Sequence, residues 1–194
     1  MTPLIAKVTF VALMVGWYVI RRPYERKASR ARVVRSARDL RETILLLVSL
    51  TGLGIVPAVY VATGFPRAAE RGFEPAVAWL GLLVAVASLV VFRLTHKALG
   101  RNWSVSLDVR EDHKLVETGI YRHVRHPMYT AFWLWALAQA LLLPNWVAGL
   151  SGLIGFGILY GFRIGREERL MLDTFGDQYR SYAARTARLI PWLH

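Results

Sequence analysis

Two stretches of sequence decide the fold of this chain, Arg125-His126-Pro127-Met128-Tyr129 and Glu167-Glu168. Two short apolar segments lie between them, and Pro144-Asn145 separates one segment from the other. Pro127 and Arg163 each lie 18 positions from Asn145, so two helical arms would end side by side at the same depth. The spacing predicts a helical hairpin that leaves one membrane surface and returns to it. Imidazole, guanidinium and carboxylate groups would then converge at the mouth of the hairpin.

The apolar residues arrive in blocks rather than as scattered stripes. The chain has 194 residues, 55% of them hydrophobic, and the blocks cover residues 3–20, 43–63, 76–95, 128–143 and 146–162. About 20 helical residues cross a hydrocarbon core of ~30 Å. The first three blocks reach that length, and the last two, at about 25 Å each, are marginal. We therefore predict an all-α integral membrane protein with about five transmembrane helices, with a re-entrant C-terminal hairpin as the alternative to a spanning one.

The basic residues are placed as they are in membrane proteins. The formal net charge is +12, with nine Lys/Arg in residues 21–41, seven in 93–126, six in 163–194 and none in the 144–145 turn. Basic loops stay on the cytoplasmic side of a membrane. Five spans with the N-terminus outside put every strongly basic stretch in the cytosol, together with the C-terminus and the site. This placement favours contact with membrane lipids and argues against a nucleic-acid partner.

The chain is expected to form a single domain, residues 1–194. Residues 1–95 would be a three-span scaffold, and residues 96–194 the catalytic half, with a cytosolic loop and a helical tail. In that tail, residues 164–175 have a helical pattern that Gly176 should end, and Asp177 should begin a further turn or two. The sequence has no cysteine, which excludes disulfides, thiolate metal ligands and a cysteine nucleophile.

Several features have a structural interpretation beside a functional one. Glycines run through the last apolar block and the residues after it, which is typical of close helix packing in membranes: Gly149, Gly152, Gly155, Gly157, Gly161 and Gly165. The last three are spaced four apart. Arg163 and Glu167 are also four apart, so they form either a local ion pair or part of a site at the membrane edge. The chain has five histidines in total, too few for the repeated clusters of membrane di-iron enzymes, so no metal is expected.

The back half resembles a known family. The stretches His113-Lys114-Leu115-Val116, Gly119-Ile120-Tyr121 and Arg125 to Tyr129, followed by Glu167-Glu168, resemble the isoprenylcysteine carboxyl methyltransferases and their phospholipid N-methyltransferase relatives. Leu99 to Ser104 looks like the lead-in of the carboxyl methyltransferases, and Phe175 to Tyr179 is similar to their tail. The resemblance covers about residues 96–191, and the front half agrees only in layout.

The resemblance implies an integral membrane enzyme that uses S-adenosylmethionine, held by the loop and the hairpin mouth rather than by a Rossmann sheet. The residues that match the family's cofactor shell are His113, Lys114, Leu115, Val116, Gly119, Tyr121, His126, Pro127 and Tyr129. The catalytic residues that it implies are Arg163, at the carboxylate of the substrate, together with Glu167 and Glu168, of which one would touch the cofactor.

The expected reaction is methyl transfer to the carboxylate of an isoprenylated cysteine or a similar lipid-tailed acid. A carboxylate with a pKa of about 3.5 is already ionised and needs no base. An amine acceptor must be neutral and releases a proton at each methylation, so a glutamate base would help it. Arg163 beside the methyl donor favours the carboxylate, and a phospholipid or amine N-methyltransferase of the same architecture is the alternative.

Overall fold

The apolar blocks fold as helices. The computed structural model describes residues 1–28, 33–36, 39–100, 108–110 and 115–193. Its elements are α1 (Pro3–Ala28), β1 (Val33–Ser36), α2 (Leu40–Leu50), a π-helical segment (Thr51–Ile55), α3 (Val56–Thr63), a 3₁₀ turn (Arg67–Ala69), α4 (Pro75–Leu99), β2 (Asp108–Arg110), a 3₁₀ turn (Gly119–Arg122), α5 (Pro127–Leu142), α6 (Trp146–Phe175) and α7 (Asp177–Arg185). The prediction of an almost wholly helical protein is confirmed.

Local sequence sets where these helices begin and end. Asp39 and Asn145 cap α2 and α6, each accepting a backbone N–H hydrogen bond through its side-chain oxygen. Pro127 occupies the first turn of α5, where a missing N–H costs nothing. Gly176 has a φ of 51° and ends α6, and α7 begins at Asp177, as the sequence predicts.

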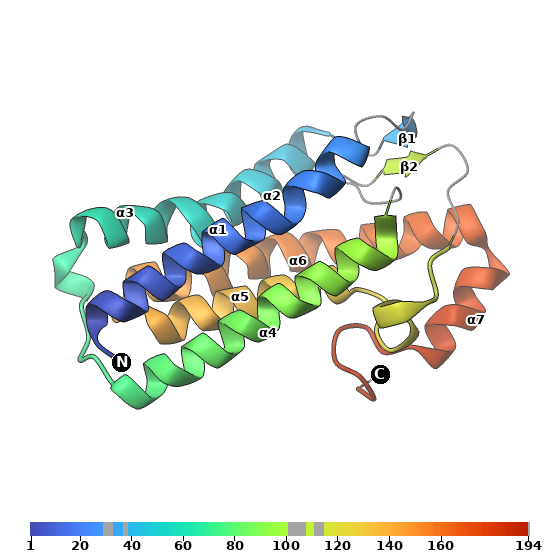
Figure 1. Cartoon of the computed structure of the whole chain (residues 1–194). Coiled ribbons are helices and arrows are strands. Elements are labelled where there is room, and N and C mark those ends of the chain that lie inside the picture. Colours follow the sequence, from blue (N-terminus) through green and yellow to red (C-terminus); the bar gives the residue numbers. More distant parts are fainter. Residues whose placement is uncertain (29–32, 37–38, 101–107, 111–114, 194) are drawn as a thin grey trace.

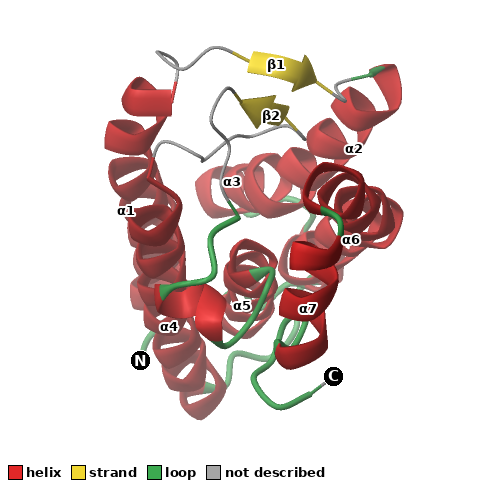
Figure 2. Ribbon diagram, turned by 90° about the vertical axis from the view of Figure 1, so that its right-hand side faces the viewer, coloured by secondary structure: helices red, strands yellow, loops and turns green. Residues whose placement is uncertain are grey.

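The helices form one elongated bundle with two distinct ends. In Figure 1, α1, the α2–α3 segment, α4, α5 and α6 run side by side. We call the end with the α5–α6 turn (Pro144-Asn145) and the α3–α4 connection (residues 64–74) the turn end. The opposite end carries β1, β2 and α7, and we call it the site end. Viewed along the bundle in Figure 2, α5 lies in the middle with the other long helices around it.

Four helical segments are long and apolar enough to cross a membrane: Pro3–Arg26, Leu40–Thr63, Pro75–Leu99 and Trp146–Phe175. The fifth predicted span, α5, is a helix of 16 residues, about 24 Å long, which is short of a ~30 Å core. The second arm of the hairpin was expected to be equally short, but it continues as one helix of 30 residues. The expected length of about 25 Å for this arm is therefore wrong, because the apolar block and the polar helix after it form one continuous helix.

The tip of the hairpin reaches the turn end of the bundle. The Asn145 side chain donates a hydrogen bond to the carbonyl of Pro66 at 2.8 Å, and the Arg71 backbone N–H donates to the carbonyl of Pro144 at 3.0 Å. Residues 64–74 also join two membrane-length segments. The hairpin tip is therefore level with a loop between two spans, which favours a spanning hairpin over a re-entrant one.

Two short strands lie at the site end. β1 pairs antiparallel with β2, joining the connection after α1 to the loop after α4. Polar and apolar residues alternate from Ser104 to Val109 in the sequence, a pattern typical of extended chain. β2 overlaps the end of this stretch, whereas residues 101–107 lie outside the described residues. β1 was not predicted. α1 extends to Ala28, into the arginine-rich connection between the first two apolar blocks.

A buried hydrogen-bond network fixes the hairpin against the front half of the chain. The Gln139 amide donates to the carbonyls of Gly52, at 3.0 Å, and Ala148, at 2.6 Å. The Ser151 hydroxyl donates to the same Gly52 carbonyl at 2.8 Å. Gln139 is fully buried, and a buried polar side chain is stable only when it is hydrogen-bonded. The π-helical segment thus accepts side-chain hydrogen bonds from both arms of the hairpin.

Close helix packing falls on some of the predicted glycines and not on others. A Cβ on Gly161 or Gly165 would meet nothing within 4 Å, and one on Gly157 would make ordinary contact with Trp133 at 3.4 Å. By contrast, a Cβ on Gly155 would lie 2.8 Å from the carbonyl oxygen of Val48. The four-residue spacing of the three glycines is therefore not a packing seam within this chain.

We predict that Gly52→Ala destabilises the protein strongly, because its Cβ would collide with the backbone carbonyl of Ser151. Overpacking of this kind costs about 1–3 kcal/mol. The matched control is Gly161→Ala, which adds a methyl group to a helix in open space and should leave stability unchanged or raised. The measurement is the thermal unfolding midpoint in detergent, and equal midpoints for the two variants would contradict the packing argument.

Candidate functional site

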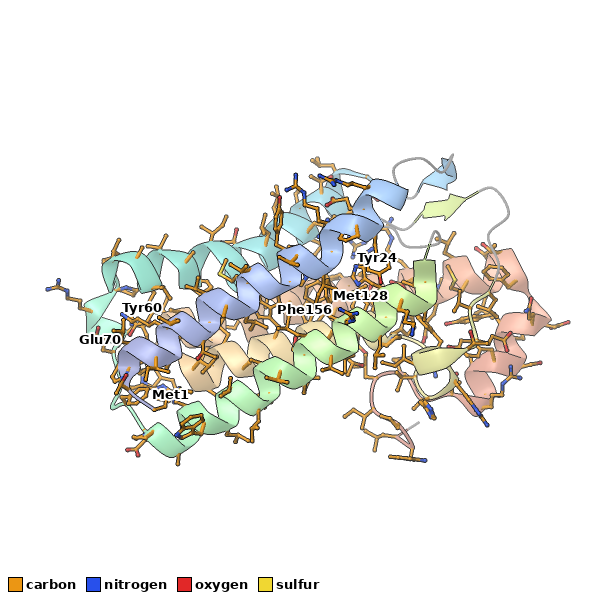
Figure 3. The ribbon with its side chains drawn as sticks, viewed as in Figure 1. Met1, Tyr24, Tyr60, Glu70, Met128 and Phe156 are labelled. Atoms are coloured by element: carbon orange, nitrogen blue, oxygen red, sulfur yellow. The ribbon has the colours of Figure 1, made fainter. Side chains whose placement is uncertain are left out.

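A cavity of about 650 Å³ lies inside the site-end half of the bundle. Its walls are mostly apolar and come from α1, α2, α4, α5, α6, α7 and the loop before α5. Met128 and Phe156, two of the lining residues, are labelled within the bundle in Figure 3. The polar side chains that line it include Tyr121, Arg125, His126, Tyr129, Arg163 and Glu167. The cavity thus combines a large apolar space with a cluster of charged groups.

Arg163 lies between two carboxylates. Its Nε is 3.2 Å from Oε1 of Glu42 and 3.9 Å from Oε2 of Glu167. Glu42 is completely buried and stands in the first turn of α2. Its backbone N–H is held by the cap residue Asp39 at 2.7 Å. The guanidinium is therefore fixed from two different helices, and its charge is balanced inside the bundle.

Glu167 faces the cavity. The Tyr129 hydroxyl donates a hydrogen bond to its Oε2 at 2.5 Å, and Nδ1 of His126 lies 3.5 Å from its Oε1. Glu167 lies one turn beyond Arg163, which puts both side chains on the same face of α6. These interactions join α5 and the loop before it to α6 through Tyr129, His126 and Glu167.

Glu168 is not among the residues that line the cavity. It contacts Nε of Arg125 at 2.8 Å, Nε2 of His126 at 3.2 Å and Nη2 of Arg188 at 2.7 Å. Neighbouring positions on a helix point about 100° apart, so Glu167 and Glu168 meet different partners. Glu168 is accordingly a residue that ties α6 to the loop and to the C-terminal segment.

His126 bridges the two carboxylates, with one ring nitrogen toward each. Its side chain is buried, and burial alone would lower the pKa of the imidazole. The hydrogen bonds and negative charges of Glu167 and Glu168 outweigh burial and hold the pKa of His126 above its usual value. The site therefore favours an imidazolium between two carboxylates.

The residues predicted for the cofactor shell are only partly brought together. Those that line the cavity are Leu115, Val116, Tyr121, His126 and Tyr129. Pro127 and Gly119 do not line it: Pro127 starts α5, and Gly119 starts a 3₁₀ turn with a φ of 63°, a backbone conformation that favours glycine. His113 and Lys114 lie outside the described residues. Of the predicted catalytic residues, Arg163 and Glu167 line the cavity and Glu168 does not.

The structure adds residues that the sequence prediction missed. Glu42 is the clearest of them. Its position beside an apolar block could have signalled a site, because a carboxylate there is costly in a membrane. An acid three positions after Asp39 also matches the pattern of an ordinary helix cap, and that pattern hides the signal. Arg188 and Tyr182 come from the C-terminal region, and Tyr182 donates to the Tyr121 carbonyl at 2.8 Å. No local pattern in the sequence indicates their part in the site.

Among the residues that the structure describes, no group of three His, Asp or Glu side chains could hold a metal ion. The expectation of a metal-free protein stays a prediction.

Comparison with known proteins gives a consistent set of relatives. The model of the isoprenylcysteine carboxyl methyltransferase (ICMT) family matches residues 79–173. A probable protein-S-isoprenylcysteine O-methyltransferase of Oryza sativa subsp. indica is 28% identical over 131 residues, 66% of this chain and 67% of the relative. The protein-S-isoprenylcysteine O-methyltransferase of Dictyostelium discoideum is 30% identical over 122 residues, 60% of this chain and 50% of the relative. That of Schizosaccharomyces pombe is 40% identical over 83 residues, 43% of this chain and 35% of the relative.

A solved structure has the same fold. It is described as the eukaryotic intramembrane Ras methyltransferase ICMT, and it matches with a TM-score of 0.51 and 23% identity. The match covers 81% of this chain and 55% of that one. The chain thus spans about two thirds of the rice relative and about half or less of the other proteins named. The intramembrane neighbour and the apolar helices support an integral, multi-pass membrane protein.

We predict that Glu42→Ala lowers the free energy of unfolding by roughly 3–5 kcal/mol, because it removes one partner of a buried ion pair. The control is Glu25→Ala, which removes the partner of Arg21 in an ion pair where Glu25 is 52% exposed and should cost less than about 1 kcal/mol. Thermal unfolding in detergent compares the two variants, and a native-like midpoint for Glu42→Ala would show that the buried pair adds nothing.

We also predict that the protein loses stability as the pH rises above neutrality. The folded-state pKa of His126 is raised, so its contribution is complete below the unfolded value of about 6.5 and is lost as the pH rises through the folded value. The unfolding midpoint should fall over this window, and His126→Gln should flatten the fall. Parallel pH profiles for the native protein and the variant would contradict this assignment.

Proposed function

We propose that this chain, whose residues 79–173 match the model of the isoprenylcysteine carboxyl methyltransferase family, methylates the carboxylate of an isoprenylated cysteine or a similar lipid-tailed acid. S-adenosylmethionine is the proposed methyl donor. The observation that carries the proposal is the position of Arg163, a buried guanidinium in the wall of a largely apolar cavity. An acid with a lipid tail matches that cavity, because its carboxylate can pair with the guanidinium and its tail can fill the apolar space.

The acceptor carboxylate would pair with Arg163. Charge-assisted bonds from a guanidinium orient a carboxylate well. Glu42 from α2 and Glu167 from α6 itself hold this guanidinium in place. The acceptor is ionised at neutral pH, so no residue of the chain has to remove a proton. The role of Arg163 is thus to align the acceptor oxygen rather than to activate it.

The lipid tail would occupy the apolar part of the cavity. Trp17, Leu46 and Phe132 line this part. Tyr18 and Leu50 also line it and are 49% and 54% exposed on the outside of α1 and α2. The cavity wall therefore reaches the surface of the bundle that faces lipid, and burial of a long hydrocarbon chain there would contribute about 0.8 kcal/mol per CH₂ group.

The polar part of the cavity suits the methyl donor. A sulfonium cation is stabilised by carboxylates and by aromatic faces, and Glu167, Tyr129 and Tyr121 provide them in the cavity wall. Arg125 and His126 also line the wall and carry donors for the amino-acid carboxylate of such a ligand. S-adenosylmethionine supplies an electrophilic methyl group, and the acceptor oxygen gains a C–O bond as the C–S bond breaks. The enclosing walls exclude water and keep the two reactants in line.

The division of the chain follows from this assignment. We propose that residues 96–194 carry most of the site, and that residues 1–95 form the scaffold and contribute Glu42 and part of the tail-binding wall. The site end would face the cytosol and the N-terminus the opposite side, because the basic stretches lie at the site end. An amine acceptor is less well served, since Arg163 would repel an ammonium group beside the donor.

We predict that Arg163→Gln reduces methyl ester formation at least ~10-fold, the loss expected for one charge-assisted hydrogen bond. The control is Arg166→Gln on the same helix, which pairs with exposed Asp39 and should retain activity. The assay transfers radiolabel from S-adenosylmethionine to N-acetyl-S-farnesylcysteine with the purified protein and counts base-labile methanol.

Two outcomes would overturn different parts of the proposal. No labile methanol from the native protein would overturn carboxyl methylation. Label from the native protein and from Arg163→Gln alike would overturn only the role of Arg163. Donor binding to the variant, measured by calorimetry, checks that it is still folded.

A further inference from the structure

The C-terminal segment, residues 186–193, lies along the loop that leads into α5. We call it the strap. The backbone N–H groups of Arg125 and His126 donate to the carbonyls of Ala187, at 2.9 Å, and Arg188, at 3.1 Å. The Thr130 hydroxyl donates to the carbonyl of Leu189 at 2.7 Å. The strap is therefore fixed as far as the first turn of α5.

That turn lies where the apolar part of the bundle ends. The Ser88 hydroxyl donates to the carbonyl of Ala131 at 2.9 Å, so these residues of the antiparallel helices α4 and α5 are level. Five residues further along α4 is Arg93, and five residues back from Ala131 is His126. Arg93 is exposed and is the first charged residue of α4. The strap thus reaches the level at which charge first appears on a membrane-length helix.

Beyond its last contact with Thr130, the strap turns outward and presents apolar side chains. Ile190 is 58% exposed, Trp192 is 91% exposed and Leu193 is 66% exposed. A hydrogen bond from the Leu193 N–H to the Ile190 carbonyl, at 3.1 Å, closes the turn. Trp192 has a φ of 65°, an unfavourable conformation for a residue with a Cβ, and this bend projects its ring away from the protein.

An exposed tryptophan between two exposed aliphatic residues is unfavourable in water but suited to the edge of a bilayer. Tryptophan concentrates at the membrane–water interface, where its ring meets the acyl chains and its N–H meets the headgroups. Arg185 and Arg188 precede the turn. They pair with Glu117 and Glu168, and both side chains remain about half exposed, where anionic headgroups can approach them. Apolar and basic side chains at this level together fit a lipid surface better than a protein partner.

We propose that residues 190–193 are an interfacial membrane anchor, with Ile190, Trp192 and Leu193 inserted at the boundary between headgroups and acyl chains. The anchor holds the strap against the first turn of α5. Because the strap carries Arg188 to Glu168 at 2.7 Å, the anchor also fixes one of the guanidinium groups beside His126. This inference does not depend on the reaction that the site performs.

The test uses the absence of cysteine from the sequence. Trp192→Cys and Leu193→Cys each give one position for a nitroxide label, and Asp177→Cys on α7 is the matched control, since the Asp177 side chain is 90% exposed. The full chain is placed in nanodiscs of phosphatidylcholine and phosphatidylglycerol. Electron paramagnetic resonance then measures collisions of the label with oxygen, which concentrates in lipid, and with a nickel chelate, which stays in water.

We expect the ratio of oxygen to nickel collisions to be at least ~2-fold higher at position 192 or 193 than at position 177, as for side chains in the interface. A ratio equal to that of the control at both positions would overturn the anchor. Two labelled positions guard against a label that disturbs the turn itself. Since no methyl transfer is measured, the result stands apart from the proposed enzymatic activity.

Discussion

The site depends on one electrostatic constraint, that a charge inside a membrane-length bundle must have an opposite charge beside it. The structure meets this constraint with an alternating row of charges. Glu42 and Glu167 flank Arg163, and His126 lies between Glu167 and Glu168. The row runs from α2 through α6 to the loop before α5. Each charge thereby has at least one neighbour of opposite charge from a different element, and the same contacts determine where the guanidinium lies in the cavity.

The packing of the hairpin makes this row possible. Gln139 and Ser151 hydrogen-bond to the Gly52 carbonyl, and glycine at positions 52 and 155 lets the backbones of the front half and α6 approach closely. These contacts fix α6 against the segment that follows α2. Because α6 is held in this position, Arg163 lies beside Glu42. A packing contact nearer the turn end thus sets the geometry of the charged groups at the site end.

The two sides of the cavity have different origins. Its apolar wall comes largely from α1, α2 and the membrane-facing turns of α5 and α6, whereas its polar wall comes from the loop before α5 and the last turns of α6. A lipid tail would thus enter the cavity from the membrane and a water-soluble donor from the aqueous side, and the two would meet near Arg163. The strap is attached to this polar wall, because Arg188 pairs with Glu168 and the backbone of the strap accepts a hydrogen bond from that of His126.

The sequence by itself determined the helical class, the hairpin around Asn145, the end of α6 at Gly176 and most of the charged cluster, because apolar block length, caps and spacing along one helix are local properties. It also placed His126, Arg163 and Glu167 together, since Pro127 and Arg163 lie equally far from the turn at Asn145 on two antiparallel arms. Only the tertiary structure decided that Glu42 completes the row, that Glu168 faces the strap, and that Gly52 and Gly155 rather than Gly161 and Gly165 form the close contacts. These depend on contacts between segments far apart in the chain, and no local pattern records which helix faces which partner.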